Sequence, residues 1–163
     1  MRLLTLLAIT TSLISCSNQL LVNSALNSAM SDNTMTTKTG ILIKSISLMA
    51  REERSLPSGL KPTSDRDIGF AAVFVELENT QETDTQVVIQ SVQIRNTITG
   101  GIQLESQKPQ SIHLHPLEIS ANQFQLMNKL GYSRLGKVKA IITYQIGNQK
   151  STIESAPVEV EQH

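Results

Sequence analysis

Aromatic residues are scarce in this chain of 163 residues: it has no Trp, two Tyr and three Phe, together 3% of the sequence. Few rings are therefore available to stack on bases or sugars, which argues against recognition of single-stranded nucleic acid or carbohydrate. No charge of one sign predominates either, because 14 Lys and Arg are balanced by 14 scattered Asp and Glu. Without a basic patch for phosphates, no nucleic-acid partner is expected. Any core must be built from Val, Ile, Leu and Ala.

Cysteine occurs once, at Cys16, so no intramolecular disulfide can form. The residues before it comprise one basic residue, Arg2, followed by a run of apolar and hydroxyl side chains. This run is shorter than the roughly 20 apolar residues of a transmembrane helix, and it has the layout of a secretory signal peptide. We expect residues 1–15 to be removed from the mature protein.

The end of this signal, Leu13-Ile14-Ser15-Cys16, resembles the lipobox of bacterial lipoproteins. The resemblance covers the first 16 residues and implies that Cys16 is acylated, for example with palmitate, and becomes the new N-terminus. Two or three acyl chains anchor a protein durably, whereas a single chain does so only marginally. Ser17 is compatible in that family with transfer to an outer membrane, so we expect a lipid-anchored protein of the bacterial cell envelope, in the outer membrane and facing the periplasm. An ordinary signal peptide with a Cys near its cleavage site is the alternative.

Residues 16–39 follow, with many Ser, Asn and Thr and only Asp32 and Lys38 charged. This composition favours a flexible tether after the lipidated Cys, with an end-to-end distance of roughly 25 Å. The apolar residues between Leu20 and Ala29 leave open a short helix that docks on the domain or lies at the membrane surface. Residues 40–163 are then expected to form one domain, because the mature chain is too short for two full ones.

From residue 41 onward, apolar residues recur with the two-residue period of strands. Strands are predicted at 41–49, 70–78, 87–99, 102–105, 112–115, 138–146 and 153–160. Gly100-Gly101 and Gly147-Asn148 are predicted as two-residue hairpins, and 51–67 as a long exposed loop. Residues 117–127 remain open between strand and helix. The apolar run that begins at Phe70 indicates a strand buried on both faces at that end.

About seven short strands, joined by hairpins and one or two longer crossings, predict an all-β fold. This pattern matches an immunoglobulin-like or fibronectin-like β-sandwich better than a closed barrel. Pro157 lacks an N–H for a strand ladder, which favours an edge position for the last predicted strand.

The motifs of catalysis are weak in this chain. Ser58-Gly59-Leu60-Lys61 and Lys38-Thr39-Gly40 match two patterns of serine β-lactamases, but their order is reversed and the Ser lies between Pro57 and Gly59, so chance explains the match. No phosphate loop, G-x-S-x-G or H-E-x-x-H sequence is present, and there are only three His. We expect neither an enzyme nor a bound cofactor.

His113 and His115 are two residues apart in a predicted strand, so both imidazoles project from one face, as ligands of a copper or zinc ion could. Glu118 and His163 are conceivable further ligands. The segments FAAVFVELENT and LGYSRLGKVKAIITYQ resemble periplasmic copper-chaperone sandwiches, although the His and Met spacing of that family is absent and Met127 stands alone. A metal carrier is therefore an alternative function, and a pair of solvent-facing His is the simpler interpretation.

The predicted loop 51–67 carries three further candidates. Arg51, Glu52, Glu53 and Arg54 form a charged cluster that we interpret as an interaction loop. Leu56 to Lys61 could insert into a protease as an inhibitor loop, a second alternative function. Asp65 and Asp67, preceded by Thr63 and Ser64, could offer oxygens to calcium, but an ordinary solvated loop explains them as well.

The leading hypothesis is a non-catalytic, membrane-anchored accessory protein. Its sandwich would present loops or an edge strand to an unknown envelope protein.

Overall fold

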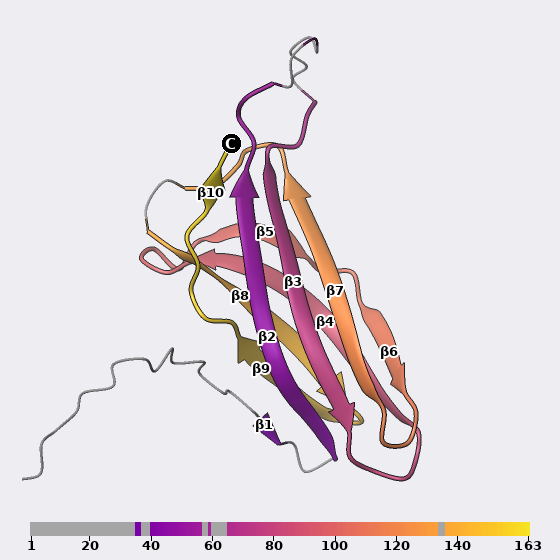
Figure 1. Ribbon diagram of the computed structural model, residues 1–163. Helices are drawn as coiled ribbons and strands as arrows, with labels where there is room; N and C mark the ends of the chain where they lie inside the picture. The colour runs from indigo at the N-terminus through magenta and orange to yellow at the C-terminus, as the bar shows by residue number, and fades with distance from the viewer. Residues whose placement is uncertain (1–34, 37–39, 57–58, 60–64, 134–135) are drawn as a thin grey trace, which may run out of the picture. The chain divides into compact units, whose positions relative to one another are not determined.

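The computed structural model describes residues 35–36, 40–56, 59, 65–133 and 136–163, all within the compact unit Ser31–His163. Within these residues the chain is all-β, with ten strands and no helix (Figure 1). The strands are β1 (Met35–Thr36), β2 (Ile41–Glu52), β3 (Gly69–Asn79), β4 (Thr85–Asn96), β5 (Ile102–Ser106), β6 (Gln110–Leu114), β7 (Ile119–Asn128), β8 (Val138–Ile146), β9 (Gln149–Glu154) and β10 (Glu161–Gln162). The expected signal peptide, Cys16 and the expected tether up to residue 34 lie outside the described residues. No described segment forms a helix long and apolar enough to cross a membrane.

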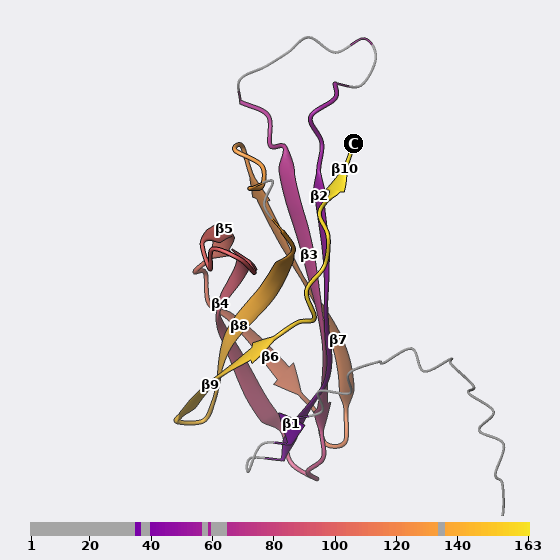
Figure 2. The ribbon, with the colours of Figure 1, turned by 90° about the vertical axis from the view of Figure 1, so that its left-hand side faces the viewer.

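The strands form two sheets that face each other (Figure 2). The first sheet has the order β1-β2-β3-β7, with β10 beside β2, and the second has the order β5-β4-β8-β9, with β6 beside β4. In chain order, β2, β3 and β7 occupy the positions of strands A, B and E of an immunoglobulin sandwich, and β4, β8 and β9 those of C, F and G. The expected fold class is confirmed. Constant-type immunoglobulin domains place strand D beside E, but here β6 pairs with β4, which leaves β7 at the margin of the first sheet.

The core is the layer of side chains between the two sheets. Burial alternates residue by residue along β3 and β8, as a strand with one face inward requires. The buried apolar residues are Ile41, Ile43, Leu48, Ala50, Ala71, Val73, Val75, Leu77, Val87, Ile89, Val92, Ile94, Leu104, Ile112, Leu114, Phe124, Leu126, Tyr132, Val138, Ala140, Ile142, Tyr144, Ile146 and Ile153. All but three are aliphatic, and each buried Val, Leu or Ile stabilises the fold by ~1.5–3 kcal/mol.

Several strand predictions are confirmed and others are corrected. The strand at 138–146 coincides with β8, and Gly147, at φ 55°, begins the two-residue turn that brings Gln149 opposite Ile146. Residues 119–128, most of which the pattern left open, form β7. The apolar run of β3 is buried on its inner side only, because no layer covers its outer side among the described residues. The exposed loop does not begin at residue 51, since β2 continues to Glu52.

The predicted strand 87–99 ends earlier, at Asn96. The buried Asn96 side-chain oxygen accepts hydrogen bonds from the backbone N–H groups of Ile98 and Thr99, both at 2.9 Å. This turn replaces the two-residue hairpin expected at Gly100-Gly101: the Asn96 N–H donates to the Gly101 carbonyl at 3.0 Å across a longer loop. A side chain that satisfies turn N–H groups competes with the strand ladder, which is why the strand stops there.

The last predicted strand, 153–160, is instead a crossing between the sheets. β9 ends at Glu154 and lies at the margin of the second sheet, and Val158 then forms a single bridge with Val138. Pro157 offers no N–H, so a continuous ladder cannot form through it. The chain then passes to the first sheet, where β10 pairs in parallel with Arg51 and Glu52 of β2 (Figure 2).

Candidate functional site

Five apolar side chains gather on the outer side of the first sheet, which points away from the second sheet. They come from three neighbouring strands, and we call them the apolar face: Met49, Phe70, Ala72, Phe74 and Met127. Met49 is 60% exposed, Met127 57% and Phe74 37%. The sequence signal is the run FAAVFV in β3, in which residues of both faces are apolar. Clustered exposed apolar residues with a polar rim are typical of surfaces that bind other proteins.

The pairing of the three strands explains why these residues meet. In the register of β2, β3 and β7, Met49 lies opposite Ala72, and Phe70 lies between Arg51 and Met127. The Arg51 guanidinium carbon is 5.1 Å from the centre of the Phe70 ring, a cation–π contact. A shallow hollow of about 320 Å³ lies over this part of the sheet.

The polar groups of this hollow come from a few side chains. Among the described residues, Arg51 and Glu161 are the titratable side chains that line it, and the remaining polar lining comes from Gln123 and Gln125. A partner could place apolar side chains on Phe74 and Met127 and an acidic group near Arg51.

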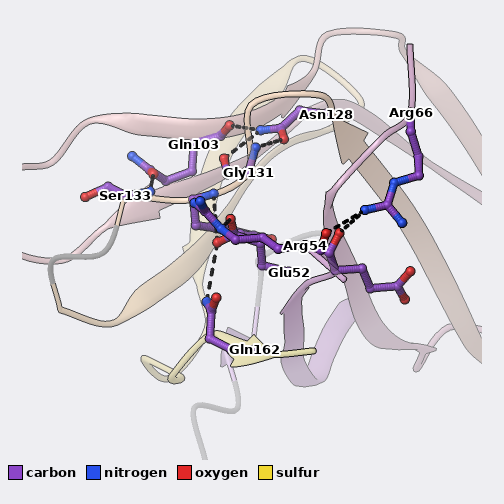
Figure 3. Close-up of polar contacts among 10 residues, drawn as sticks. Glu52, Arg54, Arg66, Gln103, Asn128, Gly131, Ser133 and Gln162 are labelled. Carbon is purple, nitrogen blue, oxygen red and sulfur yellow. Dashed lines mark hydrogen bonds and ion pairs between the residues drawn. The ribbon is translucent and has the colours of Figure 1, made fainter. Parts of the chain in front are cut away.

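At the end of β2 a carboxylate is fully buried on the inner side of the first sheet, opposite to this face. Glu52 has no exposed surface, and its two oxygens have separate partners (Figure 3). Oε1 pairs with the Arg54 guanidinium, while Oε2 accepts hydrogen bonds from the Gln162 side chain at 3.3 Å and from the Tyr132 N–H at 3.5 Å. Burial of a carboxylate is costly unless it is paired in this way. Glu52 therefore joins the end of β2, the loop after β7 and the C-terminal strand.

The loop that follows β7 packs tightly on this carboxylate. Gly131 has φ 73°, and a Cβ at this position would lie 2.5 Å from Glu52 Oε1. Asn128 holds the loop, because its side-chain oxygen accepts from the Gly131 N–H at 2.7 Å and its amide donates to the Gln103 carbonyl at 2.8 Å (Figure 3).

Tyr132, the next residue along this loop, is buried. Its hydroxyl donates to the Phe70 carbonyl at 2.8 Å. Burial, together with the neighbouring Glu52 charge, raises the pKa of Tyr132, so the phenol keeps the proton that it donates.

The charged cluster Arg51 to Arg54 is thus divided by the structure. Arg51 and Glu52 are the last residues of β2 rather than loop residues, and Glu52 is inaccessible to a partner. Arg51 pairs with Glu53 at 3.2 Å, and Arg66 donates to the carbonyls of Glu53, Arg54 and Ser55. The interaction-loop hypothesis stays a prediction for the three accessible members of the cluster.

The two candidate metal ligands are brought to one side of β6. Ile112 and Leu114 are buried, and His113 and His115 are exposed, as alternation predicts. His115 lies just after the strand, with Nδ1 3.0 Å from Asp84 Oδ1. The Glu118 carboxylate accepts from the His115 backbone N–H at 2.6 Å. The described residues contain no group of three or more His, Cys, Asp or Glu that could hold a metal ion.

His163 cannot complete this site. Its N–H donates to the Glu52 carbonyl, and Glu52 pairs with Gly69 at the start of β3. The His115 carbonyl accepts from the side chain of Asn79, at the other end of the same strand. At ~3.3 Å per residue, about 30 Å separates the two ends.

The remaining loop candidates are only partly described. Of the expected inhibitor loop, Leu56 and Gly59 are described and the rest is not. Of the possible calcium ligands, Asp65 forms an ion pair with Lys129, while Thr63 and Ser64 lie outside the described residues.

The contact between Gly131 and Glu52 can be tested with a pair of alanine substitutions. Gly131→Ala should lower the free energy of unfolding by ~2–4 kcal/mol, because the methyl group meets the carboxylate in addition to straining a positive φ. Gly100→Ala is the control, since Gly100 has a similar φ of 69° and open space around its Cβ position. It should cost only ~1 kcal/mol. Urea denaturation measures both; equal losses would show that the carboxylate does not constrain the loop.

The metal-carrier alternative can be tested at the histidine pair. We expect the double variant His113→Ala, His115→Ala to bind Cu²⁺ and Zn²⁺ with the affinity of the unmodified protein, because two exposed imidazoles without a fixed third ligand do not make a strong site. Competition with a chromogenic chelator measures the affinity. A tenfold or larger loss of affinity in the variant would instead establish the carrier.

Comparisons with known proteins give no family. No protein-family model and no curated protein sequence matches the chain. Among solved structures, one similar chain is a Bordetella pertussis protein described as ApaA, with 17% identity, a TM-score of 0.38, and coverage of 70% of this chain and 89% of that one. Another is the β-glucosidase EmGH1 of Erythrobacter marinus, with 17% identity, a TM-score of 0.31, and coverage of 69% of this chain but only 15% of the glucosidase.

Proposed function

We propose that this chain is a lipoprotein of the bacterial cell envelope, anchored to the outer membrane through Cys16 and facing the periplasm. Its β-sandwich acts as a non-catalytic interaction module for another envelope protein. The observation that carries the interaction role is the apolar face of Met49, Phe70, Ala72, Phe74 and Met127, on the outer side of a sheet whose inner side packs in the core.

The support for the anchor comes from the sequence. Leu13-Ile14-Ser15-Cys16 ends a short apolar segment that begins after Arg2, and Cys16 is the only thiol in the chain. Multiple acyl chains on Cys16 would hold the protein at a membrane without a transmembrane segment.

The support for a protein partner comes from the composition of the face. Met and Phe side chains offer large contact areas, and Met adapts its shape to different partners. Protein interfaces are enriched in Met, aromatic residues and Arg, and the face combines two Met, two Phe and the adjacent Arg51. The Gln123, Gln125 and Glu161 side chains at its margin supply the polar rim that such interfaces have.

The anchor is tested by Cys16→Ala in cells. The variant should lose incorporation of a labelled palmitate analogue and move from the membrane fraction to the soluble envelope fraction, because its acyl chains can no longer form. Ser17→Ala is the matched control and should keep both properties. Membrane association of Cys16→Ala at the level of the unmodified protein would contradict the anchor.

The interaction face is tested by site-specific photo-cross-linking in intact cells. A photoreactive residue at Phe74 should capture one discrete envelope protein, whereas the same residue at Ile98, on the loop between β4 and β5, should not. Ile98 is 69% exposed and provides a comparable apolar surface away from the face.

Adding Met49→Lys and Met127→Lys should reduce the Phe74 adduct about tenfold or more, because two apolar contacts worth ~1 kcal/mol or more each are replaced by charge. An adduct of undiminished strength in that variant, or equal adducts from Ile98, would contradict the proposed face.

A further inference from the structure

β7 is a long strand at the margin of the first sheet, where β3 is the only described strand that pairs with it. It pairs with β3 along its whole length, from Ile119 opposite Glu78 to Asn128 opposite Gly69, without a register shift. No other described strand pairs with it, so it forms the outer margin of the first sheet in Figure 1. A hollow of about 330 Å³ lies between the middle of β7, at Gln123, Phe124 and Gln125, and the connection from β5 to β6, at residues 106–110.

The hydrogen bonds at both ends of the β3–β7 ladder show which backbone groups are unpaired. Asn79 N–H donates to the Glu118 carbonyl at 2.8 Å, and Ile68 N–H donates to the Asn128 carbonyl at 2.9 Å. In an antiparallel ladder, residues alternate between pointing both backbone groups at the neighbour and pointing both away. The even-numbered residues of β7 therefore face β3. Those whose N–H and C=O face outward are Ile119, Ala121, Gln123, Gln125 and Met127.

Among the described strands, β7 is the one long edge strand whose own sequence has no feature that prevents another strand from pairing with it. Natural edge strands are usually blocked by charge, Pro, bulges or short length. β2 has a bulge near Lys44 and is covered at its ends by β1 and β10, while β5, β6 and β9 are short. β7, with the sequence ISANQFQLMN, contains no charged residue, no Pro and no Gly.

This edge is complementary to itself. A two-fold axis at Gln123 would place Ala121 opposite Gln125 of a second copy and Ile119 opposite its Met127. Every outward N–H and C=O of the five residues would then have a partner. Ile119 and Met127 are 55% and 57% exposed, so the pairing also covers apolar surface. Within the strand no like charges meet, because β7 has no charged residue.

We infer that two copies of this chain associate through antiparallel pairing of β7 with β7, which joins their first sheets into one continuous sheet. This pairing requires neither the lipid anchor nor the apolar face. The strand that pairs with β7 is β7 of a second copy, not an extended peptide from another protein.

The test is cysteine cross-linking of the full chain under mild oxidation. In the two-fold register Gln123 faces its own counterpart with Cα atoms ~5.5 Å apart, a separation that a disulfide spans. Gln123→Cys should therefore form a disulfide-linked homodimer. Ala121→Cys and Gln125→Cys should each form about tenfold less alone, yet cross-link to each other when mixed. The unmodified chain controls for Cys16.

A second measurement does not require a disulfide. Gln123→Lys places two charges together at the axis and should weaken dimerisation about tenfold or more in sedimentation equilibrium. Lys150→Gln, on the exposed edge strand β9, should not change it. A monomer for the unmodified chain at ~100 μM, where even a weak micromolar dimer would form, overturns the inference. So do equal disulfide yields at 121, 123 and 125, or a Gln123→Cys adduct to another protein in place of the homodimer.

Discussion

The layer of buried aliphatic side chains between the two sheets is the constraint on which the rest of this structure depends. Because the chain has few aromatic residues, the layer is built mainly from Val, Ile, Leu and Ala on alternate positions of each strand. The alternation fixes the register, since a slip of one residue would turn every inward side chain toward solvent. It also fixes what the outer side of the first sheet presents, because Phe70 and Phe74 must point outward once Ala71, Val73 and Val75 point inward.

The buried polar side chains of this fold lie at the ends of strands, where they form hydrogen bonds with neighbouring segments. Glu52, Asn79, Asn96 and Ser155 are all buried, and each lies at or next to the last residue of a strand. None of the buried side-chain polar atoms in the described residues lacks a hydrogen-bond partner. Glu52 connects three separate segments, because its carboxylate pairs with Arg54 and accepts hydrogen bonds from the Tyr132 N–H and from Gln162 of the C-terminal strand. An apolar residue there would leave the Tyr132 N–H without this acceptor.

The apolar face and the β7 edge meet at Met127, but they would bind their partners through different interactions. The face offers side-chain surface, which suits a partner with apolar groups of its own. The edge offers backbone hydrogen bonds, which any extended strand can use, and its lack of charge is what favours a second copy. Pairing through the edge would bring Ile119 of one copy beside Met127 of the other, where the two side chains would partly cover each other. The part of the apolar face on β2 and β3 would stay available to another protein in the homodimer.

Local pattern by itself determined the all-β class and the placement of strands such as β8, since alternating β-branched residues and a Gly-Asn turn act within a few residues of each other. The sequence also determined that no disulfide staples the domain. Only the tertiary structure decided that the apolar outer residues of β3 stay exposed and that the last segment crosses between the sheets. It also brought Glu52 into contact with Tyr132, which lies 80 residues later in the sequence. It also placed His163 far from His115. These outcomes depend on which strands become neighbours, a matter of long-range packing that no local window of residues contains.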